Sequence, residues 1–94
     1  MDMQAMMKQA QKMQEKLQKE IAEMKVEASA GGGMVTVTMS GTHELLSIRI
    51  VPEVVKSQDV EMLEDLVRAA VNDAGRKVEE ALGEKMGSLR VPGL

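Results

Sequence analysis

The chain has 94 residues, a formal net charge of −3, and no cysteine or aromatic residue. This length is typical of one domain, and so short a chain buries only somewhat more than about 60% of its unfolded surface. The lack of cysteine excludes a disulfide framework and a thiolate metal site. The lack of Phe, Tyr and Trp disfavours binding of single-stranded nucleic acid, which usually stacks its bases on aromatic side chains.

Net charge and hydropathy narrow the class of partner. A protein that binds a polyanion usually has a positive net charge, and this chain has a negative one. Whether it could bind a polyanion therefore depends on how its charges are distributed along the chain. Residues 1–19 hold four lysines against two carboxylates, a balance of +2, which leaves −5 for the remainder. No apolar run approaches the ~20 residues of a membrane span. We therefore expect a soluble cytoplasmic protein with no membrane partner.

The first element is predicted to be one long amphipathic helix over residues 2–24. Its apolar residues recur at spacings of three and four, with Gln, Lys and Glu between them, and they are Met3, Met6, Ala10, Met13, Leu17, Ile21 and Met24. The simplest partner for this stripe is the chain's own C-terminal helix. An adaptable methionine-rich docking surface is the alternative.

The lysines of this helix form a narrow stripe of positive charge. At 100° per residue, three of them lie at about 40°, 80° and 20° from the first. The four residues, called the lysine row below, are Lys8, Lys12, Lys16 and Lys19. Such a row is commonly a solvated helix face. A role in contacting phosphate groups is the competing interpretation.

Three strands are predicted next, over residues 25–30, 34–40 and 44–51. In the second strand Val35, Val37 and Met39 alternate with polar residues, the period of a half-buried strand rich in β-branched side chains. The glycines at 31–33 predict a hairpin turn, since glycine adopts positive φ without steric cost. A phosphate-binding loop would need a helix after the glycines, and a strand follows here.

A second amphipathic helix is predicted over residues 58–86, after a connector that begins beyond Pro52 and with Ser57 or Asp59 as its cap. Eight carboxylates make most of this helix unfavourable for DNA. Its Arg76 and Lys77 are the residues that could extend a basic surface. Residues 87–94, which include a proline and two glycines, are predicted to be a flexible tail.

The sequence offers little for catalysis. His43 is the single histidine and lies in a predicted turn, where it is more typical of a turn residue than of a base or metal ligand. One histidine without cysteine cannot build an ordinary zinc site. We expect no enzyme, no cofactor, no metal and no small-molecule substrate.

Several segments together resemble a known family. They are Ser29 to Val35, Val51 to Val55, Asp59 to Leu66, Ala70 to Ala74, and the opening stretch Met6 to Gln14. In this order they are similar to the YbaB/EbfC family of bacterial nucleoid-associated proteins. The chain departs from the family at Lys56-Ser57, where an Asp-Pro pair is common. The resemblance implies one α+β domain over 1–94, an α-β-β-β-α subunit with a three-stranded antiparallel sheet, found in the nucleoid.

Helix length predicts a dimer. A compact chain of this size has a radius of gyration near 12 Å, whereas a helix of about 29 residues is roughly 44 Å long. Projecting apolar stripes, and a third strand with apolar residues on both faces, favour a two-fold homodimer. The family resemblance implies the same, with helical arms held apart like tweezers.

Two functional hypotheses result. The favoured one, which rests on the resemblance, is a dimeric nucleoid-associated protein that binds double-stranded DNA through phosphate contacts, bends or bridges it, and so affects gene expression. Its DNA-binding residues would be the lysine row with Arg76 and Lys77. The alternative is a non-enzymatic protein-protein interaction module that uses its methionine-rich helical arms.

Overall fold

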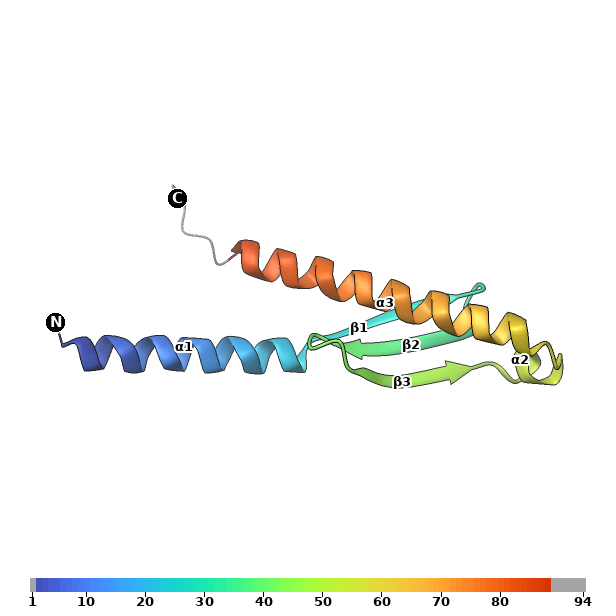
Figure 1. The fold of residues 1–94 in the computed structure, drawn as a ribbon, viewed down its shortest axis with the longest axis horizontal. Helices are drawn as coiled ribbons and strands as arrows, with labels where there is room; N and C mark the ends of the chain where they lie inside the picture. The colour runs from blue at the N-terminus through green and yellow to red at the C-terminus, as the bar shows by residue number, and fades with distance from the viewer. Residues whose placement is uncertain (1, 89–94) are drawn as a thin grey trace.

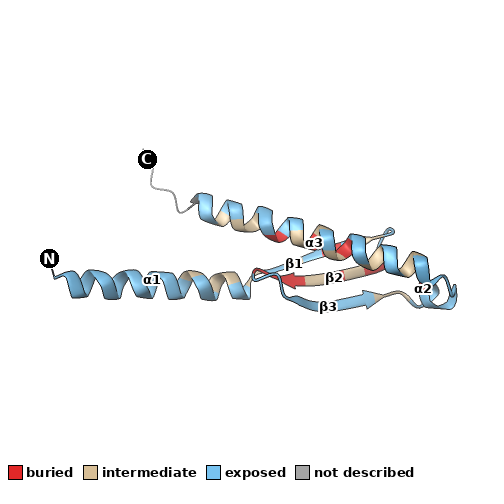
Figure 2. Ribbon diagram, viewed as in Figure 1, coloured by how far each residue is buried: buried red, intermediate tan, exposed pale blue. Residues whose placement is uncertain are grey.

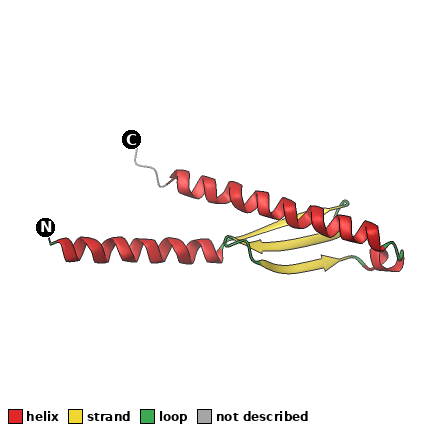
Figure 3. Cartoon of the chain, in the orientation of Figure 1, coloured by secondary structure: helices red, strands yellow, loops and turns green. Residues whose placement is uncertain are grey.

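The chain folds as a helix, a three-stranded antiparallel sheet and a long second helix, as a computed structural model of residues 2–88 describes (Figures 1 and 3). The elements are α1 (Met3–Glu23), β1 (Lys25–Ala30), β2 (Val35–Ser40), β3 (Leu45–Ile50), α2 (Pro52–Lys56) and α3 (Val60–Ser88). The predicted α-β-β-β-α order and α+β class are confirmed. The predicted tail began at Gly87, but α3 continues through Ser88, and residues 89–94 lie outside the described range.

Helix α1 leads straight into the sheet. Its N-terminus is capped by Asp2, whose side chain accepts a hydrogen bond from the backbone N–H of Gln4 at 3.1 Å. Its C-terminus is capped by Met24, which is extended and donates its N–H to the carbonyls of Glu20 and Ile21. Because β1 starts at the next residue, no loop separates helix from strand. The sheet and the helix therefore lie end to end (Figure 1).

The strands follow one another in the order β1-β2-β3. The first hairpin turns at the three glycines, and Gly31 and Gly32 have φ of +64° and +67°, where a side chain is strained. The second turn contains His43, which is exposed and also has positive φ. Its predicted place in a turn is confirmed. A register shift between Thr38 and Met39 interrupts the β2–β3 ladder.

The core lies between α3 and two of the three strands. Helix α3 packs on β1 and β2, and Val35 and Val37 of β2 belong to one buried cluster with Val78 of α3. Val35, Val37 and Met39, which the period of two places on one face of β2, are thus buried as predicted. Strand β3 lies beyond the helix, and Figure 2 shows it exposed along most of its length. Ile48, paired with Val37, remains 45% exposed.

The connector between β3 and α3 is more ordered than the sequence predicted. Pro52 starts a short helix, α2, because proline fits the first helical turn, and Val54 of this helix is buried. Of the two predicted caps for the next helix, the structure selects Asp59, whose carboxylate accepts the N–H of Met62 at 3.0 Å. Ser57 instead ends α2 and donates its hydroxyl to the carbonyl of Val54.

The expected packing of α1 on the C-terminal helix is wrong for the single chain. No residue of α1 is buried, and the two helices diverge beyond the sheet (Figure 1). The reason is geometric: the sheet occupies the apolar face of α3, while α1 extends from the sheet's end. The radius of gyration is 18.9 Å and the molecule measures 67 × 25 × 15 Å, so the chain is far longer than a compact domain of its size.

Candidate nucleic-acid interface

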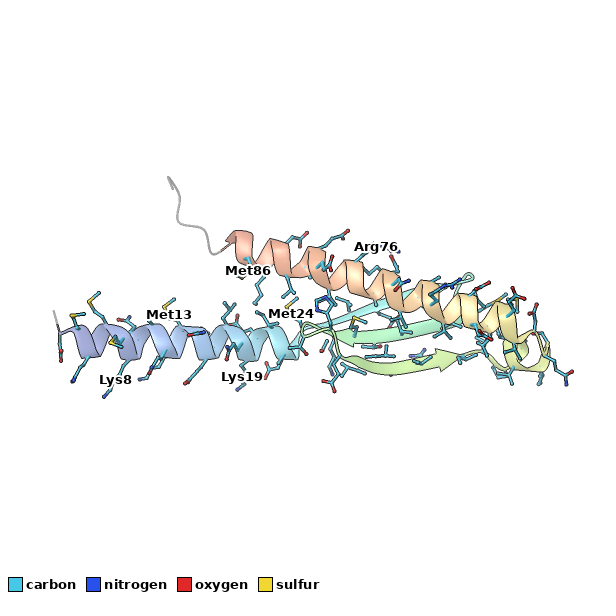
Figure 4. The ribbon with its side chains drawn as sticks, in the orientation of Figure 1. Lys8, Met13, Lys19, Met24, Arg76 and Met86 are labelled. Carbon is cyan, nitrogen blue, oxygen red and sulfur yellow. The ribbon has the colours of Figure 1, made fainter. Side chains whose placement is uncertain are left out.

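The lysine row lies along the projecting part of α1. All four side chains are exposed, and none of them takes part in an ion pair within the described residues. Lys8 and Lys19 point away from α3 (Figure 4). Over eleven residues the row extends for about 16 Å along the helix axis. This is a straight, solvent-facing line of positive charge.

The opposite side of α1 carries its apolar residues, called the methionine face below: Met3, Met6, Ala10, Met13 and Leu17. Helical spacing puts the middle of this face about 145° from the middle of the lysine row. Met13 points toward the side of α3, and Met86 lies at the end of that helix (Figure 4). The exposed fractions of Met3 and Met13 are 74% and 66%. A hollow of about 390 Å³ is lined by Met13, Gln14, Lys16, Leu17 and Glu20.

The two basic residues of α3 do not join the row. Arg76 donates to Asp73 at 3.4 Å and lies on the side of α3 that faces away from α1 (Figure 4). Lys77 donates from Nζ to the backbone carbonyl of Glu27 at 2.9 Å and lies 3.9 Å from Asp73. These contacts tie Lys77 to the outer edge of β1. The structure therefore brings the four lysines of α1 together and keeps Arg76 and Lys77 apart from them.

An ion pair links the base of α1 to the end of α3. Lys85 Nζ lies 3.0 Å from Glu20 Oε2, and both side chains are partly exposed. The hydrogen bond from Lys85, and then its charge, hold the pKa of the Glu20 carboxyl below its usual value. The charge of Lys16 acts in the same direction. Sequence reasoning missed this pair, although Lys85 lies seven residues after buried Val78 and thus on the apolar face of α3.

A second feature at the base of α1 also escaped the sequence analysis. Gly41, in the turn after β2, is buried and donates its N–H to the carbonyl of Met24 at 3.1 Å. A Cβ on Gly41 would overlap the carbonyl oxygen of Ile21. The last turn of α1 therefore rests directly on the backbone of the β2–β3 turn. Nothing in the sequence indicates that a helix packs against this glycine.

The described residues contain no other site with evident chemistry. Within residues 2–88 no three His, Cys, Asp or Glu side chains lie where they could hold a metal ion together. None of the helices in this range is long and apolar enough to cross a membrane. The distinctive feature is thus a small α+β fold with one projecting helix that carries a row of exposed lysines.

This combination defines a class of small α+β proteins that present charge on a helical arm. The chain belongs to the YbaB/EbfC DNA-binding family, whose model matches residues 1–94. This membership confirms the resemblance seen in the sequence. The family is one of DNA-binding proteins and not of enzymes.

Relatives cover nearly the whole chain. A nucleoid-associated protein of Alkaliphilus metalliredigens is 53% identical over 100 residues, 99% of this chain and 88% of the relative. One of Koribacter versatilis is 54% identical over 92 residues, 94% of this chain and 91% of the relative. The crystal structure of an uncharacterized protein from Helicobacter pylori is similar with a TM-score of 0.77 at 24% identity, covering 95% of this chain and 97% of that one. The last likeness supports the fold.

Proposed function

We propose that the protein is a two-fold dimer that binds double-stranded DNA through contacts between the lysine row and backbone phosphates. The observation that carries the proposal is the row itself, four exposed lysines on one face of α1 with no ion-pair partner among the described residues. Sixteen ångströms of duplex axis carry on the order of ten phosphates. The row can therefore meet several phosphates along one stretch of DNA.

The absence of aromatic residues favours duplex over single strands. Single-stranded binders derive much of their affinity from base stacking on aromatic rings, which this chain lacks. Lysine is a compact point charge that contacts phosphate without a fixed planar geometry. Binding by such contacts positions the protein on DNA but carries no direct sequence information. We therefore expect weak discrimination between DNA sequences.

The dimer is supported by the exposed surface of the single chain, which is larger than that of a compact monomer of the same mass. The chain exposes 7307 Å², whereas a compact monomer of 10.2 kDa exposes about 5,300 Å². The difference, about 2,000 Å² per chain, is on the scale of an extensive subunit interface. Strand β3 is an open edge with Leu46 and Ile48 about half exposed. The other edge strand, β1, has a backbone carbonyl already occupied by Lys77. Pairing through β3 would cover the open edge.

Such a dimer would carry two projecting α1 helices, each with its lysine row. A two-fold axis through the sheets would hold these arms at opposite ends or side by side, and in either case at a fixed separation. Two arms on one duplex would bend it, and arms on separate duplexes would bridge them. Both actions fit a location in the nucleoid of the cytoplasm. The two named relatives are nucleoid-associated proteins, which supports this location.

The test compares two charge reversals of equal size. Lys12→Glu alters the middle of the row, and Lys56→Glu alters an exposed lysine of α2 at the far end of the molecule. Binding of a labelled duplex is followed by fluorescence anisotropy at low salt. Lys12→Glu is expected to weaken binding severalfold for every duplex sequence, and Lys56→Glu much less. Equal affinities for Lys12→Glu and the parent would refute the role of the row.

The alternative function, a protein-protein interaction module, is favoured by one observation. The methionine face is exposed along an arm of the single chain, and methionine side chains adapt to varied apolar partners. If Met6→Gln/Met13→Gln abolishes a cellular interaction while duplex binding is unchanged, and Lys12→Glu has no effect on either, this alternative is the better account.

A further inference from the structure

The direction in which α1 projects is set at its base. Along its first four turns α1 makes no buried contact, so packing does not orient this part of the helix. Partial burial begins at Leu17 and recurs at Glu20 and Ile21. Whatever fixes the direction of the lysine row must therefore act through the last two turns of α1.

The first point of attachment is Gly41. Its N–H holds the carbonyl of Met24, and the carbonyl of Ile21 lies so close that no side chain fits at this position. This contact places the end of α1 on the β2–β3 turn. A contact at one place acts as a pivot, because a helix held only at its end can still swing about that end.

The second point of attachment lies about one turn further along α1. Glu20 meets Lys85 of α3 at 3.0 Å. By contrast, the ion pairs of Arg68, Arg76 and Lys77 connect positions three or four apart within α3 and hold no two elements together. Helix α1 is thus held at two separate points, at its end by the turn that contains Gly41 and at Glu20 by α3. Two such contacts together fix the direction of the helix.

We infer that Glu20 and Lys85 are positioning residues for DNA binding: their ion pair braces α1 against α3 and so holds the lysine row in the direction that meets the duplex. The inference rests on the proposed function for its effect on DNA, but the brace itself can be measured without DNA. The pair has a second consequence. Glu20 lies four residues after Lys16, and its engagement by Lys85 leaves Lys16 more available to phosphate.

The brace and simple electrostatics predict opposite signs for Glu20→Gln. Removing a carboxylate beside the lysine row makes α1 more positive, so charge alone predicts tighter DNA binding. Loss of the brace predicts weaker binding, because the arm then spends only part of its time in the competent direction. If that fraction is about one third, the apparent Kd rises about threefold for one arm and about ninefold for two. Glu23→Gln is the matched control, with the same charge change on an exposed residue of α1.

The arm direction is measured by pulsed dipolar EPR between two spin labels. The chain has no cysteine, so Gln9→Cys and Glu80→Cys, at exposed positions of α1 and α3, give two defined labels. Excess unlabelled protein keeps the measured pair within one subunit. We expect a narrow distance distribution in the parent and in Glu23→Gln, and a broad one in Glu20→Gln. The charge swap Glu20→Lys/Lys85→Glu should restore the narrow distribution, which a purely structural defect would not do.

The outcomes separate the brace from the proposed function. An unchanged distance distribution in Glu20→Gln, or tighter DNA binding that equals the gain in Glu23→Gln, overturns the brace. A broadened distribution with no change in DNA binding, in a protein whose binding also ignores Lys12→Glu, supports the brace and refutes the DNA role of the row. Melting curves accompany each variant, and Lys85→Met provides a second way to break the pair if Glu20→Gln fails to fold.

Discussion

The salt dependence of DNA binding offers the sharpest measure of the lysine row. Each phosphate neutralised by a cationic side chain releases condensed counterions, and log K falls by about 0.9 per contact for each decade of salt. Replacing Lys12 and Lys16 by glutamine removes half of the row without adding negative charge. The prediction therefore concerns the slope of log K against log salt as well as the affinity.

The magnitude follows from the geometry of two arms. A dimer presents two rows and thus twice the four lysines of one chain. The rows lie on one face of each helix, and if about half of these lysines contact phosphates the slope is near −3.6. Between 50 and 200 mM salt the affinity then falls about 150-fold. With Lys12→Gln/Lys16→Gln the slope becomes about −1.8 and the loss about twelvefold.

The assay is anisotropy of a labelled duplex over a series of salt concentrations. The control is Lys56→Gln/Arg68→Gln, which makes the same change in net charge on α2 and the start of α3. Both double variants should melt close to the parent, because all four side chains are exposed and exposed charges contribute little to stability. Only the row variant should flatten the slope.

Two results would refute the reasoning. If Lys12→Gln/Lys16→Gln has the same affinity as the parent and the same slope of log K against log salt, the row makes no phosphate contact. If the control variant flattens the slope by the same amount, DNA responds to net charge alone. Either result would turn attention from the row to the methionine face as the functional surface of α1.

Three further predictions concern stability. Ile48→Asp should lower the melting temperature and abolish its rise with protein concentration, because the new charge would be left unpaired in a subunit interface. The dimer is contradicted if the Tm of the parent does not depend on protein concentration and the variant has the same Tm. Gly31→Ala and Gly32→Ala should each lower the free energy of unfolding by about 1–2 kcal/mol, because both residues have positive φ. Chemical denaturation should show the larger loss for Gly31→Ala, since a Cβ at Gly31 would lie 2.7 Å from a leucine side chain. Equal losses would contradict this packing. The pKa of the Glu20 carboxyl is lowered in the folded state, so the ionised carboxylate stabilises the fold at a pH above its pKa in the unfolded chain, and this stabilisation is lost as pH falls through its pKa in the folded protein. The difference in free energy of unfolding between the parent and Glu20→Gln should therefore shrink on acidification, and a constant difference would refute the linkage.

Local patterns in the sequence were sufficient for the elements of this fold. The period of two in β2 predicted that Val35, Val37 and Met39 would be buried, because side chains of a strand alternate between faces whatever covers them. It did not predict the burial of Ser40 at the end of the strand. The helix spans were close to those observed, since apolar residues at spacings of three and four must share one face. The lysine row was visible for the same reason, as helical geometry alone places its four members together.

Periodicity identifies a face but not its partner, and this is what the tertiary structure decided. The methionine face of α1 has the pattern of a packed helix, yet the sheet already occupies α3, so the face has no partner in the single chain. Lys77 looked like part of a basic surface, and its reach to a carbonyl of β1 depends on how α3 crosses the sheet. The contact of Glu20 with Lys85 joins residues 65 positions apart, a distance that no local spacing rule spans.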